Sequence, residues 1–511
     1  MISKVNSLGV FGCQAYAVEI EVDLSSGLPG ISIVGLPDQA VKESRDRIKP
    51  AIKNSGLPFP NRRITVNLAP AEIKKEGPSF DLPIALGLLA AANVGIAPEA
   101  LKDYAILGEL SLEGEVRRVR GVLPMAIFAR DGAVRRLIVP AENAAEAAVI
   151  ETLEVYPVRS LAEAVGFLKG ELRIERFRVS PERIFERSAR PEPDFSEVRG
   201  QELAKRALEV AVAGGHNVLF IGPPGTGKTM LARRVVSILP PFTLDEAVET
   251  SQVYSLVGLL PESGLLAERP FRAPHHTVSD VALIGGGQIP RPGEVSLAHN
   301  GVLFLDELPE FDRNTLEVLR QPLEEGVVHI SRARSAVSFP ASFMFIAAMN
   351  PCPCGNLGHP RKACRCAPAQ IQKYRSRLSG PLLDRIDLQI EVPPVTVAEL
   401  SDDRRIGESS RAVRERVASA RRLQRERYRS AGILNNSQLA GRRLKEFGRL
   451  EPEAESLLNA AVDKFELSAR VYDRLRKVAR TIADLEASGP IQSHHISEAL
   501  QYRTLDRKVW I

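Results

Sequence analysis

Residues 222–229 read Gly222-Pro223-Pro224-Gly225-Thr226-Gly227-Lys228-Thr229 and lie between a short apolar run and a helical pattern. Glycines let the backbone N–H groups of such a loop turn inward around phosphate oxygens, and the following helix adds a partial positive charge at its N-terminus. Lys228 can reach the β- and γ-phosphates of a nucleotide, and Thr229 can coordinate Mg²⁺. The stretch therefore predicts a strand, a phosphate-binding loop (P-loop) and a helix that together bind ATP with Mg²⁺.

A second stretch downstream supplies the acidic groups that phosphoryl transfer needs. The apolar run 302–305 ends in Asp306 and Glu307. We expect Asp306 to hold the Mg²⁺ shell, directly or through water, and Glu307 to polarise the attacking water. A further apolar run, 343–348, leads to Asn350, whose amide could orient that water, although such an asparagine is by itself more often a turn residue.

Around these two stretches, the pattern of elements divides the chain into four segments. Residues 1–170 alternate strand-like and helix-like patterns, and residues 171–194 are charged and contain prolines, as expected of a linker. Residues 195–394 contain short apolar runs typical of a parallel sheet buried on both faces. Residues 395–511 are helical in period and rich in arginine. The sequence therefore predicts a multidomain α/β protein with an α+β N-terminal domain, an α/β core and an all-helical C-terminal lid.

Composition excludes several classes of protein. The chain has 511 residues, of which 44% are apolar and 26% charged, as in globular proteins rather than disordered, collagen-like or coiled-coil chains. The first 24 residues lack the continuous apolar stretch of a signal peptide. The longest apolar run, residues 82–97, is shorter than the ~20 residues of a membrane span. We therefore expect a cytoplasmic protein without a membrane partner.

Basic residues gather in two stretches although the net charge is only +5. Residues 42–75 hold nine basic and three acidic side chains, and residues 411–450 hold twelve basic and three acidic ones. Two basic stretches on an otherwise acidic chain suggest a polyanion such as DNA as a partner, and solvated helix faces are the alternative. From the second stretch we single out Arg421, Arg422 and Arg425 as candidate nucleic-acid contacts.

Two insertions in the core are candidates for gripping a nucleic-acid strand. Residues 327–343 alternate apolar and polar side chains around Arg332-Ala333-Arg334, which predicts a hairpin with a basic tip. Residues 270–277 predict a loop with two histidines, which suit hydrogen bonding within the loop better than metal ligation. Arg332 and Arg334 could follow a phosphate backbone without reading bases, and an ordinary solvated hairpin is the alternative.

Four of the five cysteines lie close together in two pairs. Cys352 and Cys354 are separated from Cys364 and Cys366 by nine residues, and the glycines and proline between the pairs suit a loop. Four thiolates can close a tetrahedral Zn²⁺ site with bonds of about 2.3 Å, and His359 is a candidate substitute ligand. The spacing therefore predicts structural zinc, with reduced free thiols and a redox switch as the alternatives.

The order and spacing of these elements resemble the AAA+ ATPases of the helix-2-insert branch. The resemblance implies that residues 194–201 cover the adenine and that Asn350 is the sensor-1 residue. It places the arginine finger, which reaches the γ-phosphate of a neighbouring subunit, at Arg385, and the sensor-2 residue at Arg470, where a lid helix begins. A finger that acts on a neighbour requires a ring, so the resemblance implies a homo-hexamer. An ion pair with one of the two aspartates beside it is the alternative for Arg385.

Part of the N-terminal segment resembles the catalytic domain of Lon proteases, a ribosomal S5 domain 2-like fold, in residues 75–81 and 108–116. That domain uses a serine activated by the amine of a lysine. The serine position falls on Ser79, but the lysine position reads Leu123, which cannot take a proton. The resemblance therefore implies the fold without peptidase activity. The basic stretch makes this domain a candidate for nucleic-acid binding or ring assembly.

The chain as a whole resembles the ComM/YifB family of magnesium-chelatase-like AAA+ proteins. The most specific matches are residues 34–38, 271–277 and 350–355. The resemblance implies a hexameric DNA helicase that promotes branch migration of single-stranded or branched DNA in natural transformation or recombination, with recombination proteins as partners. The alternatives are a metal-insertion ATPase subunit as in magnesium chelatase, a protease, and an AAA+ remodeller or chaperone.

Overall fold

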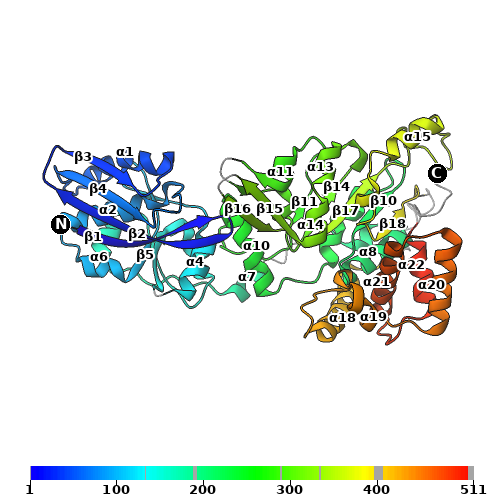
Figure 1. The fold of residues 1–511 in the computed structure, drawn as a ribbon. Coiled ribbons are helices and arrows are strands. Elements are labelled where there is room, and N and C mark those ends of the chain that lie inside the picture. Colours follow the sequence, from blue (N-terminus) through cyan, green and yellow to red (C-terminus); the bar gives the residue numbers. More distant parts are fainter. Residues whose placement is uncertain are drawn as a thin grey trace.

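The protein forms three parts along the chain, which Figure 1 shows as an N-terminal domain on the left, a core in the middle and a helical lid at the lower right. The computed structural model describes residues 2–132, 134–187, 193–287, 290–332, 335–395 and 407–503. None of the described helices combines the length and the apolar character that crossing a bilayer requires.

A seven-stranded mixed sheet forms the N-terminal domain, in the order β3 (Gly30–Val34), β4 (Arg63–Ala69), β2 (Gln14–Ser25), β1 (Ile2–Phe11), β5 (Tyr104–Ile106), β8 (Arg136–Pro140) and β9 (Glu154–Val158). Its longer helices are α1 (Gln39–Asn54), α2 (Asp81–Ala91), α4 (Val122–Asp131) and α6 (Leu161–Leu168). β1 and β2 form an antiparallel hairpin that closes where Phe11 pairs with Gln14. Every residue of α2 is buried, which explains why its sequence is apolar all round.

A five-stranded parallel sheet forms the core, in the order β11 (Phe271–Arg272), β14 (Val302–Leu305), β17 (Met344–Met349), β10 (Val218–Ile221) and β18 (Leu388–Glu391). Every residue of β10, β14 and β17 is buried, as expected for parallel strands covered on both faces. The predicted buried parallel sheet is confirmed.

Helices and one hairpin surround this sheet. The helices include α8 (Glu202–Gly214), α9 (Lys228–Arg234), α10 (Leu244–Val257), α11 (Asp280–Ile284), α12 (Glu294–Leu297), α13 (Arg313–Glu317), α14 (Arg320–Glu325), α15 (Pro368–Arg375) and α16 (Gly380–Leu383). The predicted hairpin consists of β15 (Val327–Arg332) and β16 (Ser335–Pro340), which pair antiparallel. It lies on the side of the core that faces the N-terminal domain (Figure 1). The turn between β1 and β2 packs closely on this hairpin, because a Cβ on Gly12 would lie only 2.3 Å from a methyl group of Val337.

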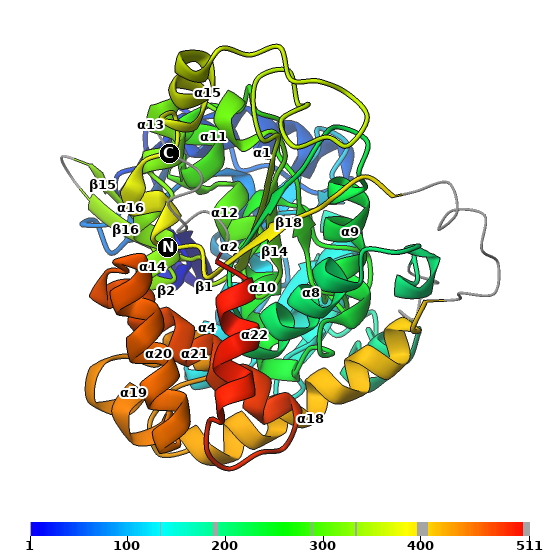
Figure 2. The ribbon, with the colours of Figure 1, turned by 90° about the vertical axis from the view of Figure 1, so that its right-hand side faces the viewer.

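The lid consists of α18 (Ser410–Tyr428), α19 (Gly441–Phe447), α20 (Pro452–Phe465), α21 (Ala469–Leu485) and α22 (Ser493–Gln501). Its apolar faces share one buried cluster with α8 and the sheet, to which Val210, Val417 and Ile482 belong. Figure 2 shows the lid helices gathered below the core, with α18 running beneath α8. The predicted C-terminal helical region is confirmed, and it packs on the core through a common apolar interior.

The N-terminal domain packs directly against the core through α4 and α10. Leu123 of α4 and Ala247 of α10 lie in one buried cluster. Ser255 of α10 donates a hydrogen bond to the buried carboxylate of Glu146, which also accepts the backbone N–H of Leu123 at 3.0 Å. Leu123, which the resemblance to Lon proteases aligns with the dyad lysine, is therefore a buried residue at a domain interface.

Residues 171–187 are more ordered than the linker-like composition of the segment 171–194 predicts. They contain helix α7 (Pro181–Arg187), whose Ile184 and Phe185 pack against the cluster between the N-terminal domain and the core. Only these two apolar side chains of a charged helix make the contact, so the sequence shows no clear helical periodicity there.

Candidate nucleotide-binding site

The P-loop lies at the carboxyl end of β10, whose neighbours in the sheet are β17 and β18. Gly225 (φ +80°) and Gly227 (φ +90°) adopt left-handed backbone conformations that favour glycine, which explains two of the glycines in the motif. Gly227 is the N-cap of α9, so Lys228 and Thr229 lie in the first turn of that helix. The sequence thus folds here as predicted, from strand to loop to helix.

The P-loop lines a cavity of about 400 Å³ together with groups at the carboxyl ends of β14 and β17. Its lining residues are Pro224, Gly225, Thr226, Gly227, Lys228, Thr229, Met230, Asp306, Glu307, Met349 and Asn350. β10, β14 and β17 are parallel, so the residues that follow them arrive at the same edge of the sheet. We call the P-loop, Asp306, Glu307 and Asn350 the nucleotide edge.

Lys228 lies at the centre of the nucleotide edge. Its ammonium group donates hydrogen bonds to the carbonyl oxygens of Gly222 (2.6 Å) and Pro223 (2.9 Å) and to Oδ1 of Asn350 (3.2 Å). Burial lowers the pKa of Lys228, although the charges of Asp306 and Glu307 act to raise it. The side chain is therefore held at the loop by neutral oxygen atoms, where it can turn to a phosphate.

Thr229 and Asp306 form the candidate Mg²⁺ position. The hydroxyl group of Thr229 donates to Oδ2 of Asp306 at 2.5 Å, and Oδ1 of Asp306 accepts the backbone N–H of Glu307 at 2.9 Å. A hydroxyl oxygen and a carboxylate oxygen are ligands that Mg²⁺ uses at nucleotide sites, with phosphates and water completing its shell. The residues present fit Mg²⁺ at this position.

Glu307 has a neighbour that the sequence pattern did not identify. Oε2 of Glu307 lies 3.6 Å from Nδ1 of His276, whose ring packs against that of His275 with 4.0 Å between ring centroids. β11 is parallel to β14, so the loop that follows β11 reaches the edge where Glu307 lies. Because β11 has only two residues, no strand pattern in the sequence could have revealed this placement.

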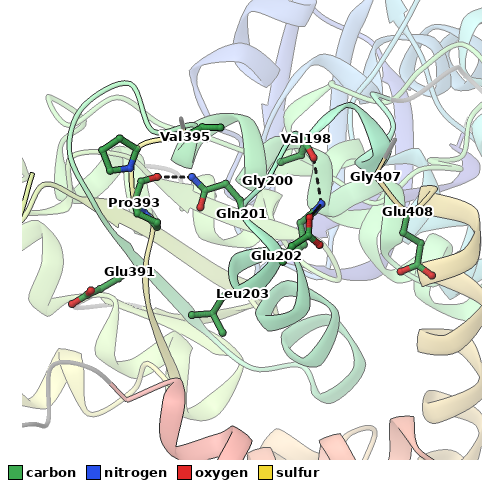
Figure 3. A pocket seen from close by; sticks show the side chains of 12 residues that line it. Val198, Gly200, Gln201, Glu202, Leu203, Glu391, Pro393, Val395, Gly407 and Glu408 are labelled. Atoms are coloured by element: carbon green, nitrogen blue, oxygen red, sulfur yellow. Dashed lines mark hydrogen bonds and ion pairs between the residues drawn. The ribbon is translucent and has the colours of Figure 1, made fainter. Parts of the chain in front are cut away.

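A second cavity, of about 610 Å³, adjoins the nucleotide edge through Gln201 (Figure 3). The side-chain amide of Gln201 donates to the carbonyl of Pro393 at 2.6 Å and to the carbonyl of Thr226 in the P-loop at 3.3 Å. Several residues of the stretch 194–201, expected to cover an adenine, line this cavity. It is the candidate base pocket.

The two predicted arginines Arg385 and Arg470 lie beside each other, and neither lines the two cavities. The guanidinium group of Arg385 pairs with Glu324 of α14. Arg470 lies in the first turn of α21 and pairs with Asp384 at 3.0 Å. We call Glu324, Asp384, Arg385 and Arg470 the arginine surface.

The ion pair of Arg385 differs from the alternative considered for it, a pair with an adjacent aspartate. Asp384 is taken by Arg470, and Oδ2 of Asp387 lies 3.1 Å from Nδ1 of His216. Glu324 is distant in sequence and comes close only through the packing of α14 beside α16, so no local pattern indicated it.

The four clustered cysteines come together in one place. Their Sγ atoms lie within 4.8 Å of one another, and Sγ of Cys352 lies 3.5 Å from that of Cys354 and 3.6 Å from that of Cys364. Four sulfurs around Zn²⁺ with bonds of about 2.3 Å form a tetrahedron with edges of about 3.8 Å, so the donor set fits zinc. Backbone N–H groups of Arg365 and Asn356 lower the pKa of Cys354 to about 6, which favours the thiolate form that binds metals.

The cysteine cluster adjoins the nucleotide edge. Gly355 has φ +76°, and a Cβ there would lie 2.6 Å from Cδ of Pro224, so only glycine allows this close approach to the P-loop. His359, the candidate substitute ligand, lies outside the cysteine group, and its Nδ1 accepts the backbone N–H of Arg361 at 3.0 Å. The four cysteines alone are therefore the candidate ligands.

The candidate nucleic-acid contacts are placed unequally. Arg421 donates to a backbone carbonyl of α8 at 2.9 Å, and burial lowers its pKa to about 10, so it belongs to the contact between lid and core. Arg422 and Arg425 are exposed on α18. The backbone of Arg332 ends β15, whereas its side chain and the whole of Arg334 lie outside the described residues.

Comparison with known proteins covers all three parts of the chain. The family models described as "Magnesium chelatase, subunit ChlI", "Subunit ChlI of Mg-chelatase" and "Magnesium chelatase, subunit ChlI C-terminal" match residues 194–400, 20–143 and 407–503. The competence protein ComM of Haemophilus influenzae is 46% identical over 99% of this chain and 98% of its own length. The protein YifB of Escherichia coli is 44% identical over 99% and 98%.

More distant similarity reaches a chloroplastic magnesium-chelatase subunit ChlI of Nicotiana tabacum, which is 27% identical over 48% of this chain and 55% of its own length. The core sheet, the P-loop and the helical lid described above lie within the regions that the family models match. By full-length identity to ComM and YifB, the chain belongs to the ComM/YifB family of magnesium-chelatase-like AAA+ proteins.

Proposed function

We propose that the protein is an ATPase that moves along DNA and promotes branch migration during natural transformation or recombination. The observation that carries the ATPase part is the convergence of Lys228, Asp306 and Glu307 on one cavity. Lys228 neutralises charge on the β- and γ-phosphates, and Glu307 polarises the water that attacks the γ-phosphorus. Thr229 and Asp306 would hold Mg²⁺, which would further neutralise the charge that develops on the phosphates.

The arginine surface supports a ring of subunits, for which a homo-hexamer is the expected form. An arginine at the γ-phosphate accelerates phosphoryl transfer, yet Arg385 and Arg470 line neither cavity of their own subunit. Arg470 is exposed, and Arg385, although its side chain is only 12% exposed, pairs with the exposed Glu324, so a nucleotide of a neighbouring subunit can approach both at this surface. In this proposal Arg385 is the finger and Arg470 the sensor, and both act on the nucleotide of the next subunit.

Two observations support DNA as the polymer. The relative from Haemophilus influenzae is named a competence protein, and 46% identity along the full chain is close enough to suggest a shared role. Arg422 and Arg425 are exposed on α18, where they can contact phosphates without reading bases. The proposed substrate is single-stranded or branched DNA, with recombination proteins as partners.

The direct experiment compares ATP hydrolysis by the full-length protein without DNA, with linear duplex and with a four-way or forked substrate. We expect hydrolysis to rise most with branched DNA and the branch point to move only when ATP is hydrolysed. ATP hydrolysis that is indifferent to every form of DNA would overturn the DNA part of the proposal and leave the ATPase part in place.

The lid contact is tested by the double variant Arg422→Ala/Arg425→Ala. If each arginine neutralises one phosphate, the slope of log affinity against log salt concentration falls by about 2, because each contact contributes about 0.9. Arg130, an exposed arginine of the N-terminal domain outside both basic stretches, is the matched control. An unchanged slope in the double variant would assign these arginines to a solvated helix face.

We further propose that the four cysteines hold a structural Zn²⁺. The distances between their sulfur atoms support this ligand set. Because Gly355 touches Pro224, a rigid cysteine loop would also fix one wall of the nucleotide cavity. The role of zinc here is mechanical, since water-activating zinc sites keep an open coordination position that four cysteines do not leave.

A metal-insertion ATPase subunit is the second candidate, because all three matching family models are named after the ChlI subunit of magnesium chelatase. That activity requires a porphyrin and a partner subunit. ATP hydrolysis that responds to a porphyrin with such a partner, and not to DNA, would favour the second candidate over the first.

A further inference from the structure

The residues around Arg385 are held firmly by the lid. We call residues 384–387 the finger segment. Arg470 of α21 donates a hydrogen bond to Oδ2 of Asp384 at 3.0 Å. Arg474, one turn further along the same helix, donates to the carbonyl of Ile386 at 3.1 Å. The lid helix therefore holds the finger segment at two points, one on each side of the proposed finger.

His216 attaches the other end of the finger segment. Its ring is fully buried, with Nδ1 3.1 Å from Oδ2 of Asp387 and Nε2 2.8 Å from the hydroxyl oxygen of Thr481 in α21. Burial alone would raise the pKa of Asp387, but the hydrogen bond and charge of the His216 ring, with help from lid cations, lower it to about 2. Asp387 is thus a carboxylate that accepts the N–H of His216.

The backbone before His216 is built to allow this contact. α8 ends at Gly214, where a Cβ would lie 2.2 Å from Nε2 of His216 and 2.5 Å from the hydroxyl oxygen of Thr481. Only glycine leaves room for the ring to bridge Asp387 and Thr481. The side chain of Asn217, on the other side of His216, donates to the carbonyl of Arg385 at 2.8 Å.

The opposite end of α8 borders the candidate base pocket. Glu202, Leu203 and Lys205 in its first turn line that cavity. A helix of the 13 residues of α8 is about 20 Å long. One rigid helix therefore runs from the base pocket to the joint at which His216 meets both the finger segment and the lid.

We propose that His216 is a positioning residue for Arg385. It fixes the finger segment to α8 and to α21. The position of Arg385 at the next subunit therefore depends on the positions of the base pocket and the lid in its own subunit. The inference rests on the proposed ATPase function and on Arg385 as the finger, and it adds a residue that touches no nucleotide. A misplaced finger weakens the transition state and leaves ground-state binding unchanged, so the effect falls on kcat and not on KM.

The experiment is a double-mutant cycle on ATP hydrolysis by the full-length protein, with kcat and KM measured for wild type, His216→Ala, Arg385→Ala and the double variant. We expect His216→Ala to lower kcat about tenfold with KM within about twofold. In the Arg385→Ala background the same change should alter kcat less than about twofold, because its effect passes through that arginine. His216→Asn, whose amide can donate near the position of Nδ1, should recover part of the lost kcat.

Thr481→Val and Asp387→Asn provide the same cycle with smaller changes in packing if His216→Ala does not fold. The matched control is His495→Ala, because this histidine is also fully buried and its Nε2 lies 3.0 Å from Glu486, away from the finger segment. It should lower the melting temperature and leave kcat within about twofold.

The outcomes separate this inference from the proposed function. Falls in kcat of equal size with and without Arg385, or a similar fall in His495→Ala, would overturn the positioning role and leave the ATPase in place. A wild-type protein that does not hydrolyse ATP, or an Arg385→Ala variant with full kcat, would overturn the proposed function and the positioning role together.

Discussion

The nucleotide edge and the arginine surface hold their cations in different ways. Lys228 is hydrogen-bonded to neutral carbonyl and amide oxygens, whereas Arg385 and Arg470 each pair with a carboxylate of the same chain. A buried cation that faces neutral oxygens gains strongly from an arriving phosphate. An arginine that is already paired must break one ion pair before it binds a phosphate, so the net gain in free energy is smaller. The difference fits the proposed division of roles, in which the nucleotide edge binds ATP within one subunit and the arginine surface acts on the nucleotide of the next.

The largest expected effect comes from Glu307→Gln at the nucleotide edge. The amide cannot polarise water as a carboxylate does, so kcat for ATP hydrolysis should fall by about 100-fold or more. ATP binding should be retained, because Lys228 and Thr229 still hold the phosphates and Mg²⁺. Steady-state hydrolysis and binding of a fluorescent ATP analogue measure the two quantities separately.

The control for this variant is Glu310→Gln. Glu310 lies three residues away and pairs with Arg377 at 2.8 Å at the surface. Its loss should leave kcat unchanged, since an exposed ion pair contributes little. If Glu307→Gln hydrolysed ATP at the rate of wild type, another group would have to orient the water.

The second prediction tests whether the two regions work across subunits. Arg385→Ala alone should lower kcat about 100-fold, because the charge that develops at the γ-phosphate then lacks its arginine. Mixed with Glu307→Gln subunits, it should regain about a quarter of the wild-type rate, because one in four interfaces of a random ring then has both residues. Hydrolysis in each pure variant and in a titrated mixture gives the comparison. A mixture with no more activity than its components would place Arg385 outside the neighbouring site.

The two regions also differ in how far the sequence predicts them. The nucleotide edge follows from short apolar runs that end in Asp306, Glu307 and Asn350, because parallel neighbouring strands carry such ends to one place. The sequence predicted a loop role for His276 but not its place beside Glu307, because the strand before it has only two residues. The positions of Arg385 and Arg470 came from family resemblance, and only the packing of distant helices shows that both lie on one surface.

The same distinction holds for the polar contacts between distant segments. From the basic stretch alone, Arg421 was a candidate nucleic-acid contact like Arg422 and Arg425. The packing of α18 on α8 instead directs its guanidinium group to a backbone carbonyl of α8. His216 carried no motif at all, and its contact with Thr481 joins residues far apart in sequence. Local patterns therefore predicted the elements and the phosphate site, whereas contacts between distant segments required the structure.

The third prediction concerns the rigidity of the nucleotide edge. The double variant Cys354→Ser/Cys364→Ser should lose bound zinc and melt at a lower temperature, because metal affinity contributes to folding. It should also bind ATP several-fold more weakly, since Gly355 of the same loop touches Pro224. Metal analysis, thermal melting and nucleotide binding measure these effects. The control Cys13→Ala, which lies outside the cluster, should keep the metal. If wild-type protein purified without zinc still bound ATP normally, zinc would have no role in keeping the nucleotide edge rigid.

The smallest expected effect comes from Glu324→Gln, which removes the in-chain partner of Arg385. Glu324 is 60% exposed and Arg385 is 12% exposed, so this half-exposed ion pair is worth about 1 kcal/mol, or about fivefold in rate. If Glu324 holds the finger back, the variant should hydrolyse ATP about twofold faster than wild type, with unchanged KM. Glu325→Gln, at the next position and paired with no finger residue, serves as the control. A tenfold loss of kcat in Glu324→Gln would reverse the comparison, because the in-chain pair would then hold Arg385 in its working position, as the hydrogen bonds of Lys228 do at the nucleotide edge.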